Sequence, residues 1–167
     1  GELVTTRLTL GQYLTNNWLP AVHRNVRPTT YDSYRRVVAK HVVGTDDLPG
    51  IGGAQLRALD AATIARFLGE LGDRGLAPKT VRNVHAILSK ALGDAQRLNL
   101  VARNVAHGLE LPAMPARESR AWTADQLRTF LAHVADDRWA PMWRVLATTG
   151  MRRGEALGLR WADVDLD

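Results

Sequence analysis

The segment from Pro78 to Ala95 constrains the fold of this 167-residue chain more than any other. Its apolar residues recur every three or four positions, which places them on one side of a helix of roughly five turns. Proline suits the first helical position, because the N–H that it lacks would have no partner there. The spacing therefore predicts a long amphipathic helix whose buried face consists of Val81, Val84, Leu88, Ala91, Leu92 and Ala95.

Three more helices are predicted in the first half of the chain. Apolar spacing from Leu8 predicts a helix that stops at Pro20, and a second helix is expected to open at Thr29-Thr30, where a hydroxyl can accept a backbone hydrogen bond. Asp60 is a suitable cap for the third. Residues 44–53 contain four glycines and a proline, so we predict a loop there, with a turn rather than a nucleotide-binding loop at its end.

The last third of the chain is predicted to hold shorter helices. Thr123 and Gln126 have the spacing of a capping box, and further helices are expected over residues 141–149 and 152–159. Alternation of polar and apolar residues over 162–167 predicts a half-buried strand. Tryptophans are expected to be core anchors, and the chain has five: Trp18, Trp122, Trp139, Trp143 and Trp161.

The excess of basic residues lies before residue 113. The formal net charge is +5, and residues 1–112 hold 14 of the 22 Lys and Arg but 9 of the 17 Asp and Glu, so the remainder is neutral. Pro112 and Pro115 interrupt the helical pattern where the charge changes. We therefore expect a basic domain over 1–112, a linker over 113–120 and a second segment over 121–167. Positive charge of this kind favours a polyanionic partner.

Composition excludes several classes of function. The absence of cysteine rules out a disulfide scaffold, thiolate zinc sites, iron–sulfur clusters and a thiol nucleophile, and is typical of a reducing cytoplasm. The five histidines lack the spacing of metal ligands, so we expect no metal site. No apolar run approaches the roughly 20 residues that span a bilayer, and we expect no membrane partner.

A stripe of polar residues lies away from the apolar face of the predicted long helix. It contains Lys79, Asn83 and Lys90, with Arg82 beside it. Cations can neutralise phosphates, and an Asn amide can pair with an adenine edge in the major groove. A second helix has a similar edge, with backbone N–H groups at its start that can bind a phosphate; its candidate residues are Thr30, Arg35 and Arg36. The same patterns also fit solvated helix faces that bind no ligand.

The segment Thr148–Trp161 contains a second candidate site. A glycine turn precedes a short predicted helix that opens at Arg152, and Glu155 follows one turn later. The planar guanidinium of Arg can bind two phosphate oxygens at once. Glu155 can hold that guanidinium or accept hydrogen bonds from the backbone of the first turn. The alternative is an ordinary surface Arg–Glu pair.

These motifs resemble the tyrosine recombinase, or phage integrase, family over nearly the whole chain. The specific match is to the catalytic-arginine box, which reads Thr149-Gly150-Met151-Arg152-Arg153-Gly154-Glu155 and continues with Leu157, Leu159-Arg160-Trp161 and Asp163-Val164-Asp165. Looser matches follow the order of the family's helical core-binding domain: Arg27-Pro28-Thr29-Thr30-Tyr31-Asp32-Ser33-Tyr34, Ala77-Pro78-Lys79-Thr80-Val81-Arg82-Asn83 and Ala102-Arg103-Asn104-Val105-Ala106. The residues from Trp122 to Leu127 are similar to the start of the catalytic domain.

The resemblance implies a mainly α chain, with a helical SAM-like core-binding domain, a linker and the first helices of an α/β catalytic domain. Enzymes of this family break and rejoin double-stranded DNA through a 3′-phosphotyrosyl intermediate, as tetramers and without a metal or nucleotide cofactor. Arg152 corresponds to the arginine that clamps the scissile phosphate, and Glu155 to an acidic support position. A region of the family that commonly meets DNA is matched by Lys79, Thr80, Arg82 and Asn83.

Other parts of the family's pattern have no match in this sequence. The last tyrosine is Tyr34 and the last lysine is Lys90, so the hairpin lysine and the late nucleophilic tyrosine are missing, as is the His-x-x-Arg box. We therefore expect a DNA-binding fragment of a longer recombinase that is monomeric and inactive in cleavage by itself. Two alternatives stay open: a complete non-catalytic helical DNA-binding regulator, and a helical protein–protein interaction module.

Overall fold

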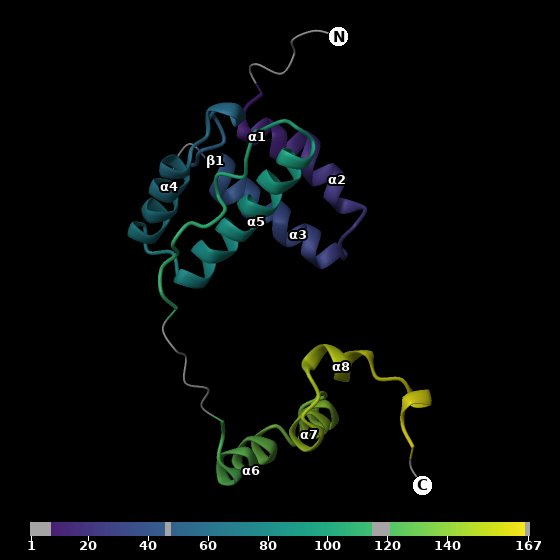
Figure 1. The fold of residues 1–167 in the computed structure, drawn as a ribbon. Helices are drawn as coiled ribbons and strands as arrows, with labels where there is room; N and C mark the ends of the chain where they lie inside the picture. Colours follow the sequence, from purple (N-terminus) through teal and green to yellow (C-terminus); the bar gives the residue numbers. More distant parts are fainter. Residues whose placement is uncertain (1–7, 46–47, 115–120, 166–167) are drawn as a thin grey trace. The chain divides into compact units, whose positions relative to one another are not determined.

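Helix α5 (Pro78–Arg97) is the central helix of the first unit in the computed structural model, which describes residues 8–45, 48–114 and 121–165 (Figure 1). It begins at the predicted proline, and all six residues of the predicted apolar face are buried, together with Ile87. The chain divides into two units, residues 1–115 and 116–167, and α5 belongs to the first. Of the linker predicted over 113–120, positions 115–120 lie outside the described residues.

The first helical segment continues past the proline at which it was predicted to stop. It begins with α1 (Leu10–Gln12), widens into the π-helical turn η2 (Tyr13–Trp18) and returns to α geometry in α2 (Leu19–His23). The predicted stop at Pro20 is wrong because this proline lies in the first turn of α2, directly after the change of helical geometry. A residue without an N–H is tolerated at that position.

Helix α3 (Pro28–Val37) begins where the sequence predicted, but with a different cap. Its N-cap is Arg27, and no side chain accepts a hydrogen bond there, so the predicted hydroxyl cap is wrong. Pro28 provides the helical start instead, through its fixed φ angle. The π-helical turn η3 (Val38–Val43) extends the helix and buries Val38 and Val42 in the core.

Residues 44–53 contain a small hairpin as well as the predicted loop. Strand β1 (Gly44–Thr45) pairs antiparallel with β2 (Leu48–Pro49). A Cβ at Gly50 would lie 2.2 Å from the carbonyl oxygen of Val42, so only glycine allows this close backbone approach. Strands of two residues are too short to show alternation, which is why the sequence did not predict them.

The 3₁₀ turn η4 (Leu56–Ala58) leads into α4 (Ala61–Asp73), whose predicted cap is confirmed. Asp60 Oδ1 accepts a hydrogen bond from the backbone N–H of Thr63 at 2.7 Å. This bond holds the pKa of the Asp60 carboxyl below its ordinary value, so the cap is charged at neutral pH. The helix ends before Gly75, which has a φ of 82°, as expected for a glycine after a C-cap.

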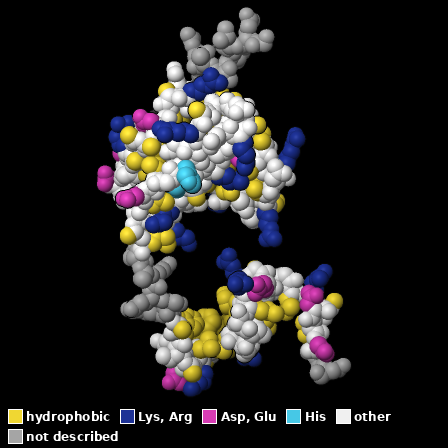
Figure 2. Space-filling model, viewed as in Figure 1, with side chains coloured by type: hydrophobic (Ala, Val, Ile, Leu, Met, Phe, Trp, Pro, Cys, Tyr) yellow, Lys and Arg dark blue, Asp and Glu magenta, His cyan; other side chains and the backbone are white. Residues whose placement is uncertain are grey.

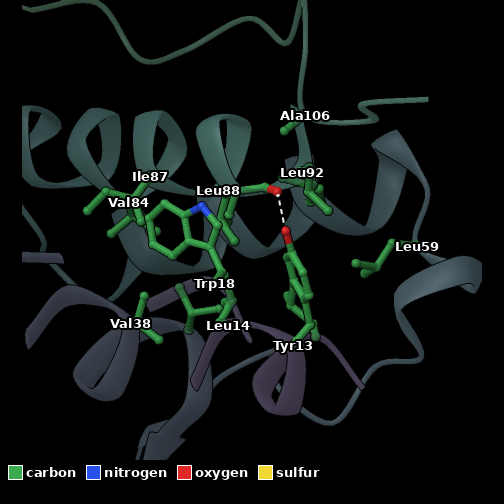
Figure 3. Packing of buried hydrophobic residues seen from close by; sticks show 14 of the residues in the cluster. Tyr13, Leu14, Trp18, Val38, Leu59, Val84, Ile87, Leu88, Leu92 and Ala106 are labelled. Carbon is green, nitrogen blue, oxygen red and sulfur yellow. Dashed lines mark hydrogen bonds between the residues drawn. The ribbon is translucent and has the colours of Figure 1, made fainter. Parts of the chain in front are cut away.

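The core of the first unit forms where the first helical segment packs on α5 (Figure 3). The Tyr13 hydroxyl donates to the carbonyl oxygen of Ala91 at 3.0 Å, and Trp18 Nε1 donates to Asp94 Oδ2 at 2.8 Å. Both aromatic side chains are almost fully buried, and these bonds satisfy their polar atoms. Burial raises the pKa of the Tyr13 hydroxyl to about 12, with a further contribution from the Asp94 carboxylate.

The described part of the second unit contains three helices and a 3₁₀ turn: α6 (Ala124–His133), α7 (Ala140–Thr149), α8 (Arg153–Gly158) and η5 (Trp161–Asp163). The predicted capping box of Thr123 and Gln126 is confirmed, with bonds of 2.9 and 3.3 Å. The predicted strand over 162–167 is wrong for the described residues, because η5 occupies its start. Residues 166 and 167 lie outside the described part.

The prediction that tryptophans anchor the core is confirmed for Trp18 alone among the described residues. Trp18 is 3% exposed, whereas three others are 45% to 86% exposed: Trp122, Trp139 and Trp161. Trp143 is half-buried and makes an edge contact with Phe130, which also contacts Trp122. Three short helices present too little apolar surface to enclose such large rings.

Substitution of the centre of the α5 face should destabilise the first unit strongly. Leu88 is fully buried, so Leu88→Ala is expected to lower the free energy of unfolding by about 2–5 kcal/mol. Leu98→Ala removes the same atoms from a side chain that is 66% exposed and should cost no more than about 0.5 kcal/mol. Chemical denaturation followed by circular dichroism compares the two. Equal losses would contradict the burial of this face.

The hydroxyl of Tyr13 should give the fold a distinctive alkaline response. Its pKa is raised from 10.0 to about 12, so the unfolded chain loses the proton first, and the stabilisation present below pH 10 is lost between pH 10 and 12. The expected loss is up to about 2–3 kcal/mol. Tyr13→Phe should be less stable at pH 8 by about 1 kcal/mol and should lack this part of the decline. Denaturation at each pH measures it, with Tyr31→Phe as the control that retains the decline.

Candidate nucleic-acid interface

Lys79, Asn83 and Lys90 form an exposed stripe along α5, which we call the α5 stripe. They are spaced by four and seven residues, so their side chains project from one side of the helix, away from its buried face. Within the part of the chain that the structure describes, none of the three side chains has a hydrogen bond or ion pair. Their donors and charges are therefore available to an external anion.

Arg82 lies at the border of the α5 stripe and is less free than the sequence suggested. Its side chain is half-buried, and its Nε donates to the carbonyl oxygen of Pro112 at 3.0 Å. The acceptor is 30 residues away in sequence, so no local pattern could have predicted the bond. The Nε of this guanidinium is therefore already hydrogen-bonded within the first unit.

Thr80 lies on the other border of the α5 stripe, where it lines a groove of about 350 Å³ with Lys40, His41 and Arg74. Burial, followed by the nearby Lys40 ammonium, lowers the pKa of His41, so its ring is neutral at pH 7. Arg74 is already engaged, because it lies 3.7 Å from Glu70 and donates to a backbone oxygen. The available positive charge of this groove therefore comes mainly from Lys40.

Of the predicted residues of α3, Thr30 lies in the first turn, whereas Arg35 and Arg36 lie in the last turn and are exposed. Arg35 Nη2 is 3.8 Å from Asp32 Oδ1, and Arg36 Nε donates to the backbone oxygen of the same residue at 3.3 Å. Exposed contacts of this kind contribute little free energy, so both guanidinium groups can exchange them for a phosphate. Thr30 is half-buried at the start of the helix.

Helices α3 and α5 share an uncapped start. Their N-caps are Arg27 and Ala77, no side chain accepts a hydrogen bond there, and neither first turn contains an acid. In contrast, α4 and α6 are capped by the side-chain oxygens of Asp60 and Thr123. Free N–H groups at a helix start carry partial positive charge and are suited to phosphate. Helix α7 (Ala140–Thr149) likewise begins without a side-chain cap or an acid in its first turn, and α3 and α5 are the uncapped helices that carry the predicted DNA-binding residues.

Lys and Arg side chains are scattered over the visible face of the first unit (Figure 2). Figure 2 shows Lys and Arg side chains over this face, with Asp and Glu side chains mostly near one edge. The same view shows hydrophobic side chains on the surface of the second unit, in agreement with its exposed tryptophans. The distribution matches the charge difference between the two parts of the sequence.

Arg152 is the N-cap residue of α8, directly after the turn in which Gly150 has a φ of 69°. Both alternatives for Glu155 occur together: Oε2 accepts from the Arg152 backbone N–H at 2.8 Å, and Oε1 lies 3.1 Å from Arg152 Nη1. The Arg152 side chain is 88% exposed, and Arg153 beside it is exposed as well. The geometry holds one edge of the guanidinium and leaves the rest open to an anion.

The described residues contain no group of three or more His, Asp or Glu side chains that could hold a metal ion. None of the described helices is long and apolar enough to cross a membrane.

No family model matches the sequence. Among curated proteins, the ICEBs1 integrase of Bacillus subtilis is 22% identical over 150 residues, covering 89% of this chain and 39% of the relative. Tyrosine recombinase XerC of Chromohalobacter salexigens is 28% identical over 158 residues, covering 89% of this chain and 50% of the relative. The chain thus spans about two fifths to half of the length of these curated relatives.

Solved structures agree with the curated relatives. A lambda integrase dimer bound to a COC′ core site matches with a TM-score of 0.75 and 20% identity over 96% of this chain and 44% of that one. The phage integrase SAM-like domain of Moth 1796 from Moorella thermoacetica matches with a TM-score of 0.54 and 28% identity, over 71% of this chain and 97% of that one. The predicted fold class and the resemblance to tyrosine recombinases are confirmed.

The sequence missed the residues that tie the end of the first unit to α5. Asn104 Nδ2 donates to the carbonyl oxygen of Ser89 at 2.8 Å, and His85 Nε2 lies 2.8 Å from the carbonyl oxygen of Ala106. An Asn in a loop and a His on a helix have many uses, so neither residue alone signals such a contact. Asn104 lies in a segment that resembles the recombinase family, which was the one available signal.

Proposed function

We propose that this chain is the core-binding unit and the first part of the catalytic unit of a site-specific tyrosine recombinase, and that its first unit binds double-stranded DNA. The observation that carries the proposal is the α5 stripe, whose exposed Lys79, Asn83 and Lys90 have no partner among the described residues. Two ammonium groups about 16 Å apart along a helix can reach two phosphates of one duplex, and the amide between them can read a base edge.

Three further observations support duplex DNA as the partner. The second uncapped helix, α3, adds Thr30, Arg35 and Arg36 to the same kind of surface. The excess positive charge lies in the first unit. Two structural neighbours, lambda integrase and the Tn1549 transposon integrase, are described in complex with DNA.

In the second unit we assign Arg152 to the scissile phosphate and Glu155 to the support of that arginine. A guanidinium that is held on one edge and exposed on the other can clamp two phosphate oxygens and stabilise the negative charge of the transition state. The remaining groups of the reaction would come from residues outside this sequence, so the 167 residues alone should not cleave DNA. A recombinase of this kind would act as a tetramer on chromosomal or phage DNA in the bacterial cytoplasm, while this chain alone would be monomeric.

Loss of either cation of the α5 stripe should weaken duplex binding and its salt dependence. Each phosphate contact contributes about 0.9 to the slope of log affinity against log salt, so Lys79→Gln and Lys90→Gln should each lower the slope by about that amount. Arg66→Gln is the control, because it removes an exposed cation of another helix, α4, that lies 3.9 Å from Glu70 and is therefore already paired. Fluorescence anisotropy with a labelled duplex at several salt concentrations measures all four proteins.

The same titration separates the two alternative functions. A protein–protein interaction module would show no steep salt dependence and no difference between the stripe variants and Arg66→Gln. That result would contradict the proposed DNA interface. A non-catalytic regulator would bind DNA like the recombinase fragment but would not support cleavage when joined to the missing catalytic residues.

Substitution of Arg152 should lower strand cleavage by the longer recombinase but leave the duplex affinity of this chain nearly unchanged. Because Arg152 belongs to the second unit and not to the α5 stripe, Arg152→Ala should change the duplex affinity of this chain by less than about twofold. In a longer recombinase that includes this chain and a nucleophilic tyrosine, the same change should lower strand cleavage by at least about 100-fold. Trapping of covalent protein–DNA complex on a nicked substrate measures the second effect. Full cleavage by the Arg152→Ala protein would refute the assignment.

A further inference from the structure

Residues 100–112, which we call the strap, lie along α5 and are held by contacts with its side chains and backbone. Asn104 donates to the carbonyl oxygen of Ser89, and the carbonyl oxygen of Ala106 lies 2.8 Å from His85 Nε2. The partners on α5 move toward its start as the strap advances, so the strap runs antiparallel to the helix. Ala106 is fully buried, and other strap residues pack partly buried against the core: Val101, Val105, Leu109 and Leu111.

Arg82 provides the last of these contacts, near the start of α5. Its Nε donates to the carbonyl oxygen of Pro112 at 3.0 Å. Arg82 lies three residues after Lys79 and directly before Asn83, on the border between the strap and the α5 stripe. Among the described residues, no hydrogen bond or ion pair involves its Nη1 or Nη2. One edge of the guanidinium therefore holds the strap while the other has free donors.

We propose that Arg82 couples duplex binding to the docking of the strap. Its Nε holds Pro112, and its two Nη groups contact a phosphate of the same duplex that the α5 stripe binds. This inference rests on the proposed function, since it requires that α5 meets DNA. Arg82 acts here as a positioning residue for the point at which the chain leaves the strap.

The chemistry of the side chain makes this double role specific to arginine. A guanidinium has five N–H donors in a rigid plane, so one edge can bind a carbonyl while the opposite nitrogens bind a phosphate. A lysine has a single nitrogen at the end of a flexible chain and cannot serve both acceptors in that geometry. Coupling of this kind is reciprocal: if DNA favours the docked strap, the docked strap favours DNA by the same factor.

Hydrogen exchange of the strap, measured with and without DNA, tests the coupling. The probe is a mixed-sequence duplex of about 30 base pairs, or three helical turns, at low salt. In the wild-type chain, saturating duplex should slow exchange of the amides of residues 105–111 and 113 about fivefold, the effect of one strengthened hydrogen bond. In Arg82→Lys, which keeps the charge, duplex affinity should stay within about threefold, and the DNA-dependent slowing should disappear.

A double-mutant comparison checks the reciprocal effect on affinity. Asn104→Ala removes an anchor of the strap without changing the α5 stripe. It should weaken duplex binding about two- to fivefold when Arg82 is present, and have no measurable effect in the Arg82→Gln background. A purely structural role for Arg82 would leave the two backgrounds equally sensitive.

The outcomes separate this inference from the proposed function. Duplex binding with unchanged strap exchange in the wild type, or equal DNA-dependent slowing in Arg82→Lys, would overturn the coupling and leave the DNA interface intact. Absence of salt-dependent duplex binding by the wild-type chain would overturn both.

Discussion

The orientation of α5 about its own axis is the constraint on which the first unit depends. Consecutive residues of a helix differ by about 100° in direction, so a rotation by one residue would turn the Lys79 side toward the core. The bonds from Tyr13 to Ala91 and from Trp18 to Asp94 oppose such a rotation, because both donors are nearly buried and would lose their partners. Burial of the apolar face and these two bonds therefore together determine which side chains of α5 face the solvent.

Periodicity explains which parts of this arrangement could be predicted. The apolar face of α5 follows from the 3.6-residue repeat, and the α5 stripe is its complement on the same helix, so one pattern gives both. Caps with a side-chain oxygen, at Asp60 and Thr123, were also readable because they depend on neighbours three residues away. The predicted stop at Pro20 failed because a change to π geometry, which no local pattern signals, moved the proline into a tolerated position.

Contacts between residues far apart in sequence were beyond prediction. The bond from Arg82 to Pro112 joins two residues whose types are common on any surface, and only the path of the strap brings them together. The pairing within the catalytic-arginine segment could be predicted, because it involves only neighbouring residues. Arg152 and Glu155 are three residues apart on one short helix, so their pairing needs only local geometry. The role proposed for the Arg152–Glu155 pair depends on residues outside the described part of the chain. Only the resemblance to the recombinase family indicated that role.

The cations of this chain differ in whether an acidic side chain is paired with them, and this difference affects how each can interact with DNA. Arg35, Arg97, Arg128, Arg152 and Arg160 each have an acidic partner three residues away, so their net field at a distance is small. Lys79 and Lys90 have none among the described residues, and an approaching duplex would feel their full charge. An arginine that must act on one phosphate gains from the opposite arrangement, because a fixed carboxylate orients the guanidinium before the phosphate arrives. The unpaired lysines of the first unit thus fit the attraction of a duplex. The paired arginine of the second unit fits the precise placement of one phosphate.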